Sequence, residues 1–268
     1  CAKLDEIWTP SSWQRDSFSE SGVPASKIFV MKEAVDIHVF DPARVEPIAL
    51  PGSRLDDLSR RPYTFLAVFK FEDRKGWMPL VESYIREFAG VADVNLVLRT
   101  YLHRAGDSGD VHDKSEISNR IHSYLKKVPD LPSRSLWPTI DIVSEHLHSL
   151  ALPGLYKACD AFVLATHGEG WGLPTHEAMA MGLPVITTAW GGSTEFVNER
   201  WAYPINITGL VPTSTSDPWL RGFKWANPDK KHLQELMRYV YEHPDDARQK
   251  GLLGRQYVLD NLTPDLVA

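Results

Sequence analysis

Short hydrophobic runs alternate with segments of helical spacing along most of this chain. Apolar and β-branched residues cluster at 63–69, 95–99, 139–143, 161–165 and 183–188, which predicts buried strands. Apolar residues at helical spacing predict the helices between and after them, at 77–88, 115–127, 152–160, 174–182, 229–241 and 244–262. Because strands and helices alternate, the pattern predicts a doubly wound parallel sheet of the α/β class.

The first part of the chain predicts a smaller unit followed by a linker. Residues 5–10 read as the end of a strand, and Ser11 and Gln14 fit a capping box that opens a helix. Residues 28–30 predict a further short strand. Proline and charge are frequent in residues 44–62, which is typical of a linker or an irregular segment.

A glycine-spaced turn follows the predicted strand at 161–165. Gly168, Gly170 and Gly172 allow the backbone to come close to a ligand, and Pro174 suits the first turn of a helix. The first amides of a helix have no internal partners and carry the positive end of its dipole. The turn therefore predicts a site for an anionic group such as phosphate.

Two carboxylates, Glu169 and Glu177, bracket this turn. Carboxylates repel phosphate, so their useful partners would be the hydroxyls of a ribose or a hexose. A ligand that places phosphate on the helix amides and sugar hydroxyls on the two glutamates is a nucleotide sugar. The alternative is that Glu177 only favours the helix N-terminus and that Glu169 is a solvated loop residue.

The pair Glu169-x7-Glu177, inside GEGWGLPTHEAMAMGLPVI, resembles the signature of the retaining GT-B glycosyltransferases of the group 1, family 4 type. The downstream GGSTEFV resembles the same family's next loop. The resemblance implies that Glu169 lies beside the donor hexose and that Glu177 holds the ribose hydroxyls. It also implies a Rossmann-like donor domain, the C-terminal half of a two-domain fold, with donor contacts at Gly170, Trp171, Gly172, Leu173 and Thr175.

Basic residues follow the strand at 63–69, where the resembling family clamps the donor diphosphate. Lys75-Gly76 matches the family's Lys-Gly, whereas Lys70 stands where the family usually has arginine and the loop is one residue shorter. With Glu169, both lysines are predicted catalytic residues, although either could be a solvated loop charge. The turn after 139–143 is where the family cradles the base, which makes His146 a candidate there.

A long polar and aromatic loop is expected at 202–227. Its aromatic residues Trp219, Phe223 and Trp225 could cover a bound donor or stack on a sugar. The other interpretation, which we favour, is that they hold the loop against the domain.

The stretch at 8–42 resembles the family's passage from the N-terminal domain into the crossing between domains. We expect residues 1–40 to be the end of an N-terminal acceptor domain, 41–62 a linker and 63–268 the donor domain. Most of the acceptor half would then lie upstream, and that missing N-terminal domain is an expected partner.

Composition and charge narrow the class of protein. The net charge of −6 and the lack of a basic run argue against a nucleic-acid partner, and no apolar stretch reaches transmembrane length. Two cysteines make no disulfide framework, and the cytoplasm is the favoured compartment. Because no Asp-x-Asp occurs, we expect neither a metal site nor a cofactor beyond the donor substrate itself.

The sequence thus predicts transfer of a hexose from a UDP- or GDP-linked donor to an unknown acceptor, with retention. A non-catalytic nucleotide-sugar binding module, or an epimerase on the same scaffold, is the alternative. A nicotinamide-binding turn is disfavoured because its third glycine would be needed where Leu173 stands. No Gly-Lys-Ser/Thr of a P-loop follows.

Overall fold

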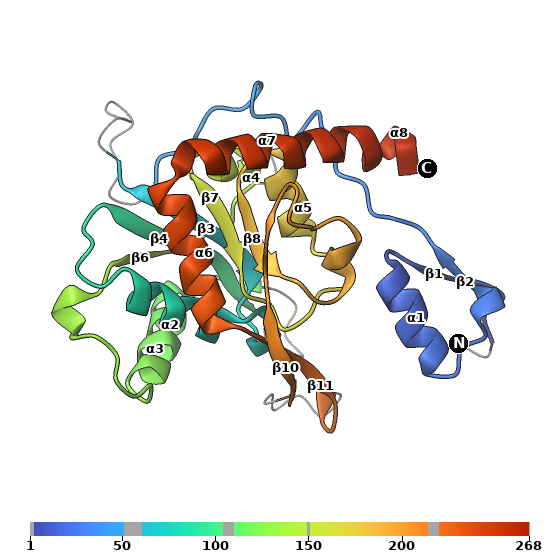
Figure 1. Cartoon of the computed structure of the whole chain (residues 1–268), viewed down its shortest axis with the longest axis horizontal. Helices are drawn as coiled ribbons and strands as arrows, with labels where there is room; N and C mark the ends of the chain where they lie inside the picture. The colour runs from blue at the N-terminus through green and yellow to red at the C-terminus, as the bar shows by residue number, and fades with distance from the viewer. Residues whose placement is uncertain (1–2, 51–60, 104–109, 149–150, 214–219, 268) are drawn as a thin grey trace.

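The computed structural model describes residues 3–50, 61–103, 110–148, 151–213 and 220–267, and its centre is a mostly parallel sheet (Figure 1). The strands of this sheet are β3 (Tyr63–Lys70), β4 (Val94–His103), β5 (Asp110–Val111), β6 (Thr139–Val143), β7 (Ala161–Leu164), β8 (Val185–Thr188) and β9 (Tyr203–Ile205). Only β5 runs antiparallel to its neighbour, β4. The predicted strands are therefore confirmed, with ends shifted by a few residues.

The order of the strands locates the ligand-binding edge of the sheet. The order is β5-β4-β3-β7-β8-β9, with β6 also paired to β4. The strands that come next along the chain, β4, β5 and β6, therefore lie on one side of β3, and the later strands β7, β8 and β9 lie on its other side. The parallel strands follow the doubly wound order in which dinucleotide-binding sheets are built. In such sheets, ligands bind beyond the carboxyl ends of the strands where the direction reverses. Here that point lies between β3 and β7.

Helices cover both faces of the sheet (Figure 1). Contacts join α2 to α6, and α5 to α7 and the strands β7 and β8. The helices of this domain are α2 (Trp77–Glu87), α3 (Lys114–Leu125), α4 (Leu152–Lys157), α5 (Leu173–Ala180), α6 (Lys230–Glu242), α7 (Pro244–Asn261) and α8 (Pro264–Val267). All residues of β7 and β8 are buried, because helices lie on both sides of these central strands.

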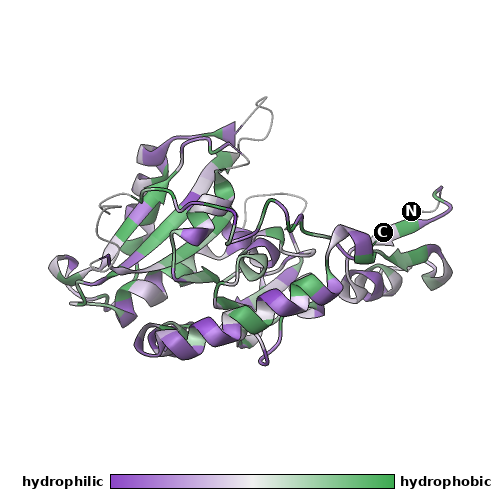
Figure 2. Ribbon diagram, turned by 90° about the horizontal axis from the view of Figure 1, so that it is seen from above, coloured by the Kyte–Doolittle hydropathy of each residue, from purple (hydrophilic) through white to green (hydrophobic). Residues whose placement is uncertain are grey.

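Hydropathy follows this layering. The strands are mainly hydrophobic, whereas hydrophobic and hydrophilic residues alternate along α7 at the surface (Figure 2). Phe65, Leu96 and Phe162 of three adjacent strands are fully buried, and Tyr84 and Phe88 cover Phe65 with ring centroids 6.4 and 5.7 Å away. Burial of these large side chains is the main stabilising contribution expected for this layer.

The N-terminal unit consists of two parallel strands, β1 (Ile7–Thr9) and β2 (Ile28–Val30), and helix α1 (Ser12–Glu20). The Ser11 hydroxyl accepts a hydrogen bond from the Gln14 amide at 3.2 Å, which confirms the predicted helix cap.

The prediction of a long loop at 202–227 is wrong. After β9, the strands β10 (Ile207–Pro212) and β11 (Lys224–Pro228) form an antiparallel hairpin. Every residue of β10 is exposed or half-buried, so this strand lacks the hydrophobic alternation that identifies strands in a sequence. Trp225 is buried and stacks on His167 with ring centroids 4.6 Å apart, so it holds the hairpin against the domain as we favoured. Trp219 lies outside the described residues.

The division into residues 1–40, 41–62 and 63–268 stays a prediction. Residues 51–60 of the expected linker lie outside the described residues, and the rest of it is irregular. Between the two parts, the Val35 amide donates to the Leu262 carbonyl oxygen at 3.1 Å.

Candidate active site

Three loops meet at the carboxyl edge of the sheet where its direction reverses. They follow β3, β7 and β8, and two glycines let their main chains touch. A Cβ on Gly76 would lie 1.7 Å from the Ala165 carbonyl oxygen, and Gly76 also has φ of +67°. A Cβ on Gly192 would lie 1.6 Å from the Gly170 carbonyl oxygen. Since no other residue fits these contacts, glycine is required for the loops to assemble in this form.

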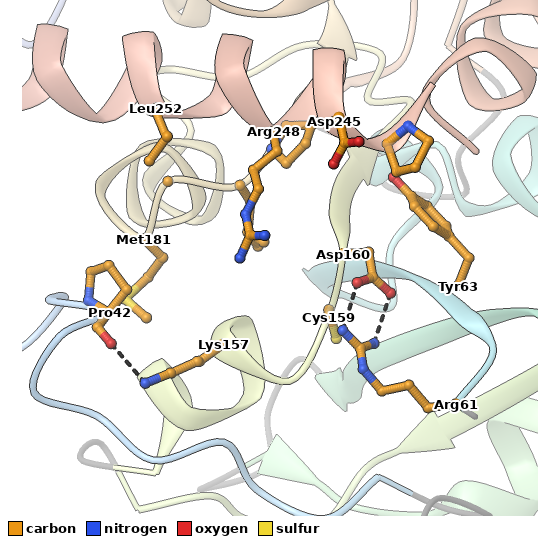
Figure 3. A pocket seen from close by; sticks show the side chains of 14 residues that line it. Pro42, Arg61, Tyr63, Lys157, Cys159, Asp160, Met181, Asp245, Arg248 and Leu252 are labelled. Atoms are coloured by element: carbon orange, nitrogen blue, oxygen red, sulfur yellow. Dashed lines mark hydrogen bonds and ion pairs between the residues drawn. The ribbon is translucent and has the colours of Figure 1, made fainter. Parts of the chain in front are cut away.

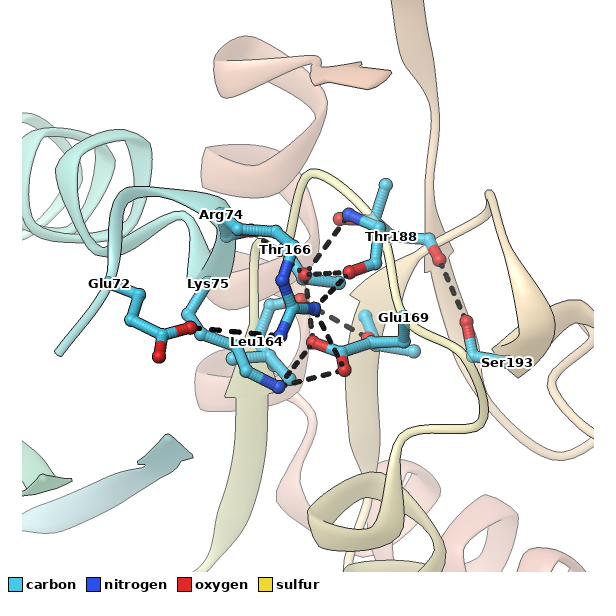
Figure 4. A network of polar contacts seen from close by, with 10 residues as sticks. Glu72, Arg74, Lys75, Leu164, Thr166, Glu169, Thr188 and Ser193 are labelled. Carbon is cyan, nitrogen blue, oxygen red and sulfur yellow. Dashed lines mark hydrogen bonds and ion pairs between the residues drawn. The ribbon is translucent and has the colours of Figure 1, made fainter. Parts of the chain in front are cut away.

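Glu169 lies at the centre of this loop cluster (Figure 4). Its carboxylate accepts hydrogen bonds from Lys75 Nζ at 2.8 and 2.9 Å and from the Thr166 hydroxyl at 2.9 Å. Arg74 Nη1 approaches one carboxylate oxygen at 3.4 Å. The Glu169 residue is only 8% exposed, so these contacts satisfy a carboxylate that water barely reaches. The interpretation of Glu169 as a solvated loop residue is therefore wrong.

Lys75 and Glu169, both predicted as site residues, form one ion pair. The Lys75 ammonium contacts both carboxylate oxygens and its side chain is 12% exposed. Lys75 is the last residue of the 3-10 helix η3 (Asp73–Lys75), which begins two residues after Phe71 and has Gly76 as its C-cap. A diphosphate that binds Lys75 would have to share the ammonium with Glu169 or displace it.

Arg74 is a cation that the sequence reasoning missed. Its Nη1 donates to the Gly168 carbonyl oxygen at 2.6 Å, and its side chain is 36% exposed beside Glu169. Lys70, which we predicted as the second basic residue, is half-buried at the end of β3, and no described residue forms an ion pair or hydrogen bond with its ammonium. The adjacent Arg-Lys at 74–75 was the available signal, because both follow the correct strand.

Glu177 lies on α5 in a different environment. The Tyr156 hydroxyl donates to Glu177 Oε2 at 2.7 Å. Burial raises the pKa of Glu177 to about 7, and this hydrogen bond opposes the rise. Burial also raises the pKa of Tyr156 well above its ordinary value, so the phenol stays a donor. Glu177 is thus a carboxyl that gains or loses its proton near neutral pH. It lies on α5, the helix that follows Glu169 of the Lys75–Glu169 pair along the chain.

The start of α5 presents main-chain groups rather than side chains. Gly172 has φ of +98° and precedes the helix, and the His176 amide is the first to bond back, to the Gly172 carbonyl oxygen at 3.0 Å. Leu173 is 49% exposed, whereas Trp171 and Thr175 are buried. Any contact of these two residues with a donor would therefore come from their amides.

The turn after β6 carries His146 at the surface. Its ring lies 5.8 Å from that of His112, whose Nδ1 contacts the Ser144 carbonyl oxygen. Arg99 of β4, which pairs with the last residue of β6, is buried, and burial lowers its pKa. Its Nε and Nη1 have no hydrogen-bond partner among the described residues. The role of His146 stays a prediction, and Arg99 is a polar group near this turn that sequence patterns did not single out.

A second pocket lies at the amino edge of the sheet (Figure 3). Arg61 and Asp160 form a bidentate ion pair there, with N–O distances of 2.7 and 2.5 Å. The Asp160 carboxylate also accepts a hydrogen bond from the Thr64 amide. This pair joins the starts of β3 and β7. Because ligands of parallel sheets bind at the opposite edge, we assign this pocket a structural role.

Two further properties bear on partners. Within the described ranges, no group of three or more His, Cys, Asp or Glu side chains is placed to hold a metal ion. None of the described helices combines the length and the apolar character needed to cross a bilayer.

Comparisons with known proteins bear on the family and on the fold. Residues 124–218 match the family described as Glycosyl transferases group 1. Mannosylfructose-phosphate synthase of Agrobacterium fabrum is 28% identical over 127 residues, which are 47% of this chain and 25% of that protein. The sequence match therefore spans about a quarter of this relative.

Solved structures show the same fold at low identity. Sucrose-phosphate synthase of Thermosynechococcus elongatus superimposes with a TM-score of 0.69 at 19% identity, over 99% of this chain and 56% of that one. Anabaena HepE, solved in complex with UDP and glucose, gives a TM-score of 0.67 at 13% identity, over 97% and 60%. The chain thus spans between half and two thirds of these structures. Over residues 124–218 its sequence is therefore similar to the group 1 glycosyltransferases, and over most of its length it shares the GT-B architecture of these structures.

Proposed function

We propose that this chain binds a nucleotide diphosphate hexose and takes part in transferring the hexose to an acceptor, with retention at the anomeric carbon. One observation carries the proposal. The Glu169 carboxylate is fixed by Lys75 and Arg74 at the reversal point of the sheet, directly before the free amides of α5. Cations and helix amides suit a diphosphate, and a fixed carboxylate suits hexose hydroxyls.

The donor would lie along the carboxyl edge of the sheet. Its base would meet the turn after β6, its ribose hydroxyls Glu177, and its diphosphate the start of α5 with Lys75. Glu169 would then orient the hexose. HepE, whose structure holds UDP and glucose, supports this class of donor by its shared fold, and we propose UDP before GDP on that ground.

Transfer requires charge stabilisation at the leaving group. An acceptor hydroxyl oxygen forms a bond to the anomeric carbon, and the bond from that carbon to the diphosphate breaks, with its electron pair leaving on the diphosphate. The O–H bond of the acceptor breaks in the same process, and its proton passes to an oxygen of the departing diphosphate. Lys75, Arg74 and the α5 amides would stabilise this developing charge in a partly water-excluded site. Glu169 would position the hexose rather than donate a proton.

Calorimetry with UDP and GDP tests the proposal. Glu177→Ala should weaken binding of the preferred nucleotide by about 1–3 kcal/mol, the scale of lost charged hydrogen bonds. Glu177→Gln tests the same contact without a cavity, and Glu199→Ala, at an exposed position before β9, is the matched control. Nucleotide binding that is equal in wild type and both Glu177 variants would refute the ribose role. No binding of either nucleotide to the folded chain would refute the proposed donor site.

A further inference from the structure

A cavity of about 240 Å³ lies between helix α1, the loop after β7 and the β10–β11 hairpin. Its size is below the roughly 300–1,000 Å³ of sites for drug-sized ligands, which suits a single ring. It opens beside Glu169 but on the side of the hairpin. The hairpin follows β9 at one end of the sheet, and the turn proposed for the base follows β6 at the other.

The walls of the cavity are aromatic. Trp13 of α1 meets Trp190 edge to face, with ring centroids 4.9 Å apart. The Trp190 ring lies against Gly168, where a Cβ would approach it to 2.8 Å. Phe223 of the hairpin also lines the cavity and is 64% exposed. The tryptophans are therefore held in place, and one phenylalanine face stays open to a ligand.

Polar groups border the same cavity. The Gln14 side-chain amide lies against Gly170, where a Cβ would come within 2.7 Å of its Nε2. Arg74 and Glu169 line the cavity as well. Aromatic faces combined with a few hydrogen-bonding groups suit a ring that has apolar C–H faces and hydroxyls at its edge. A hydrocarbon chain would leave these polar groups unsatisfied.

We propose that this cavity binds a pyranose ring of the acceptor, stacked on Phe223 and Trp190 with its hydroxyls toward Gln14 and Arg74. The assignment rests on the proposed function, because a donor that extends from the β6 turn to Glu169 leaves this side to the acceptor. The N-terminal unit supplies part of the site. The Ser11 hydroxyl donates to the Gly170 carbonyl oxygen at 3.3 Å, which attaches α1 to the turn.

Saturation-transfer NMR with methyl α-glucopyranoside, methyl α-mannopyranoside and methyl β-galactopyranoside tests the cavity, with UDP present. At least one glycoside should receive saturation from the protein. Phe223→Ala should weaken its binding about fivefold, the scale of one lost ring contact. Leu210→Ala, at another exposed hydrophobic position of the same hairpin outside the cavity lining, should leave binding unchanged.

The outcomes separate this inference from the proposed function. Absence of transfer to every glycoside, or equal binding to wild type and Phe223→Ala, overturns the acceptor cavity. If UDP still binds in that case, the proposed donor site stands. Glycoside binding that depends on Phe223, without any UDP binding, supports the sugar cavity but refutes the donor assignment on which its acceptor role rests.

Discussion

Glu177 should make the stability of the folded chain depend on pH. Its pKa is about 7 in the folded state, against an ordinary value of 4.5 that the unfolded chain should approach. Between these pH values the folded state holds a proton that the unfolded state has released. The free energy of unfolding should therefore fall as the pH rises from 4.5 through 7.

The structure sets the size of this effect. At about 1.4 kcal/mol for each pH unit, the difference between 4.5 and about 7 corresponds to about 3 kcal/mol. Glu177 is half-buried, so water screens part of the penalty and this value is an upper limit. Glu177→Gln removes the ionisation and keeps an oxygen to accept the Tyr156 hydrogen bond. At pH 8 the variant should be more stable than wild type by up to about 3 kcal/mol, and near pH 4.5 the two should be similar.

Urea unfolding at a series of pH values measures the difference in the free energy of unfolding between wild type and Glu177→Gln. Burial lowers the pKa of His176 to about 4, which makes stability rise with pH up to about 6.5. Because both chains carry His176, this opposite trend cancels in the difference. Tyr156→Phe removes the hydrogen bond that favours the carboxylate, so it should move the transition to higher pH. A wild-type and Glu177→Gln difference that stays constant from pH 4.5 to 8 would refute the reasoning.

Three further predictions concern the loop cluster. Gly76→Ala places a Cβ 1.7 Å from a main-chain oxygen and should cost about 3 kcal/mol or more of unfolding free energy in urea, whereas Gly90→Ala, with open space around it, should cost about 1 kcal/mol. Lys75→Met should lower the free energy of unfolding by about 3 kcal/mol, because the buried Glu169 carboxylate would lose its paired ammonium. Adding Glu169→Gln should restore most of that free energy in a double-mutant cycle. The Glu195 carboxylate accepts a hydrogen bond from the Ser12 amide at the start of α1, at 2.9 Å. Glu195→Gln removes its charge, so amide hydrogen exchange in α1 should accelerate about threefold while exchange in the sheet stays unchanged. Equal exchange in both chains would show that Glu195 does not hold α1.

The parts of the site that lie within one strand–turn–helix unit could be predicted from sequence. Gly172, Pro174 and Gly182 mark the start and end of α5 by local backbone chemistry, and the strand on each side is a continuous apolar run. The location of the site followed from alternation of strands and helices, since a doubly wound sheet binds ligands at one edge.

Other parts depended on contacts between distant segments. Lys70 is the last residue of β3 and Arg74 follows that strand, and only the short turn of η3 decides that Arg74 reaches Glu169. Strand β10 has no buried residue, and the hairpin is held by Trp225 and by the Ala226 amide, which donates to the His167 carbonyl oxygen at 3.1 Å. Such a segment has no periodic pattern, so its strands appear only once its tertiary partners are known.

The main-chain contacts at Gly76 and Gly192 determine where this scaffold can vary. Each glycine joins two loops, so a side chain at either position displaces both loops and the carboxylate between them. New ligand preferences must therefore arise from residues that meet the ligand without supporting a neighbouring loop. His146, which follows β6, and Phe223, in the β10–β11 hairpin, are exposed and are such positions. A library that varies these two residues and keeps the glycines should yield many folded chains that differ in what they bind.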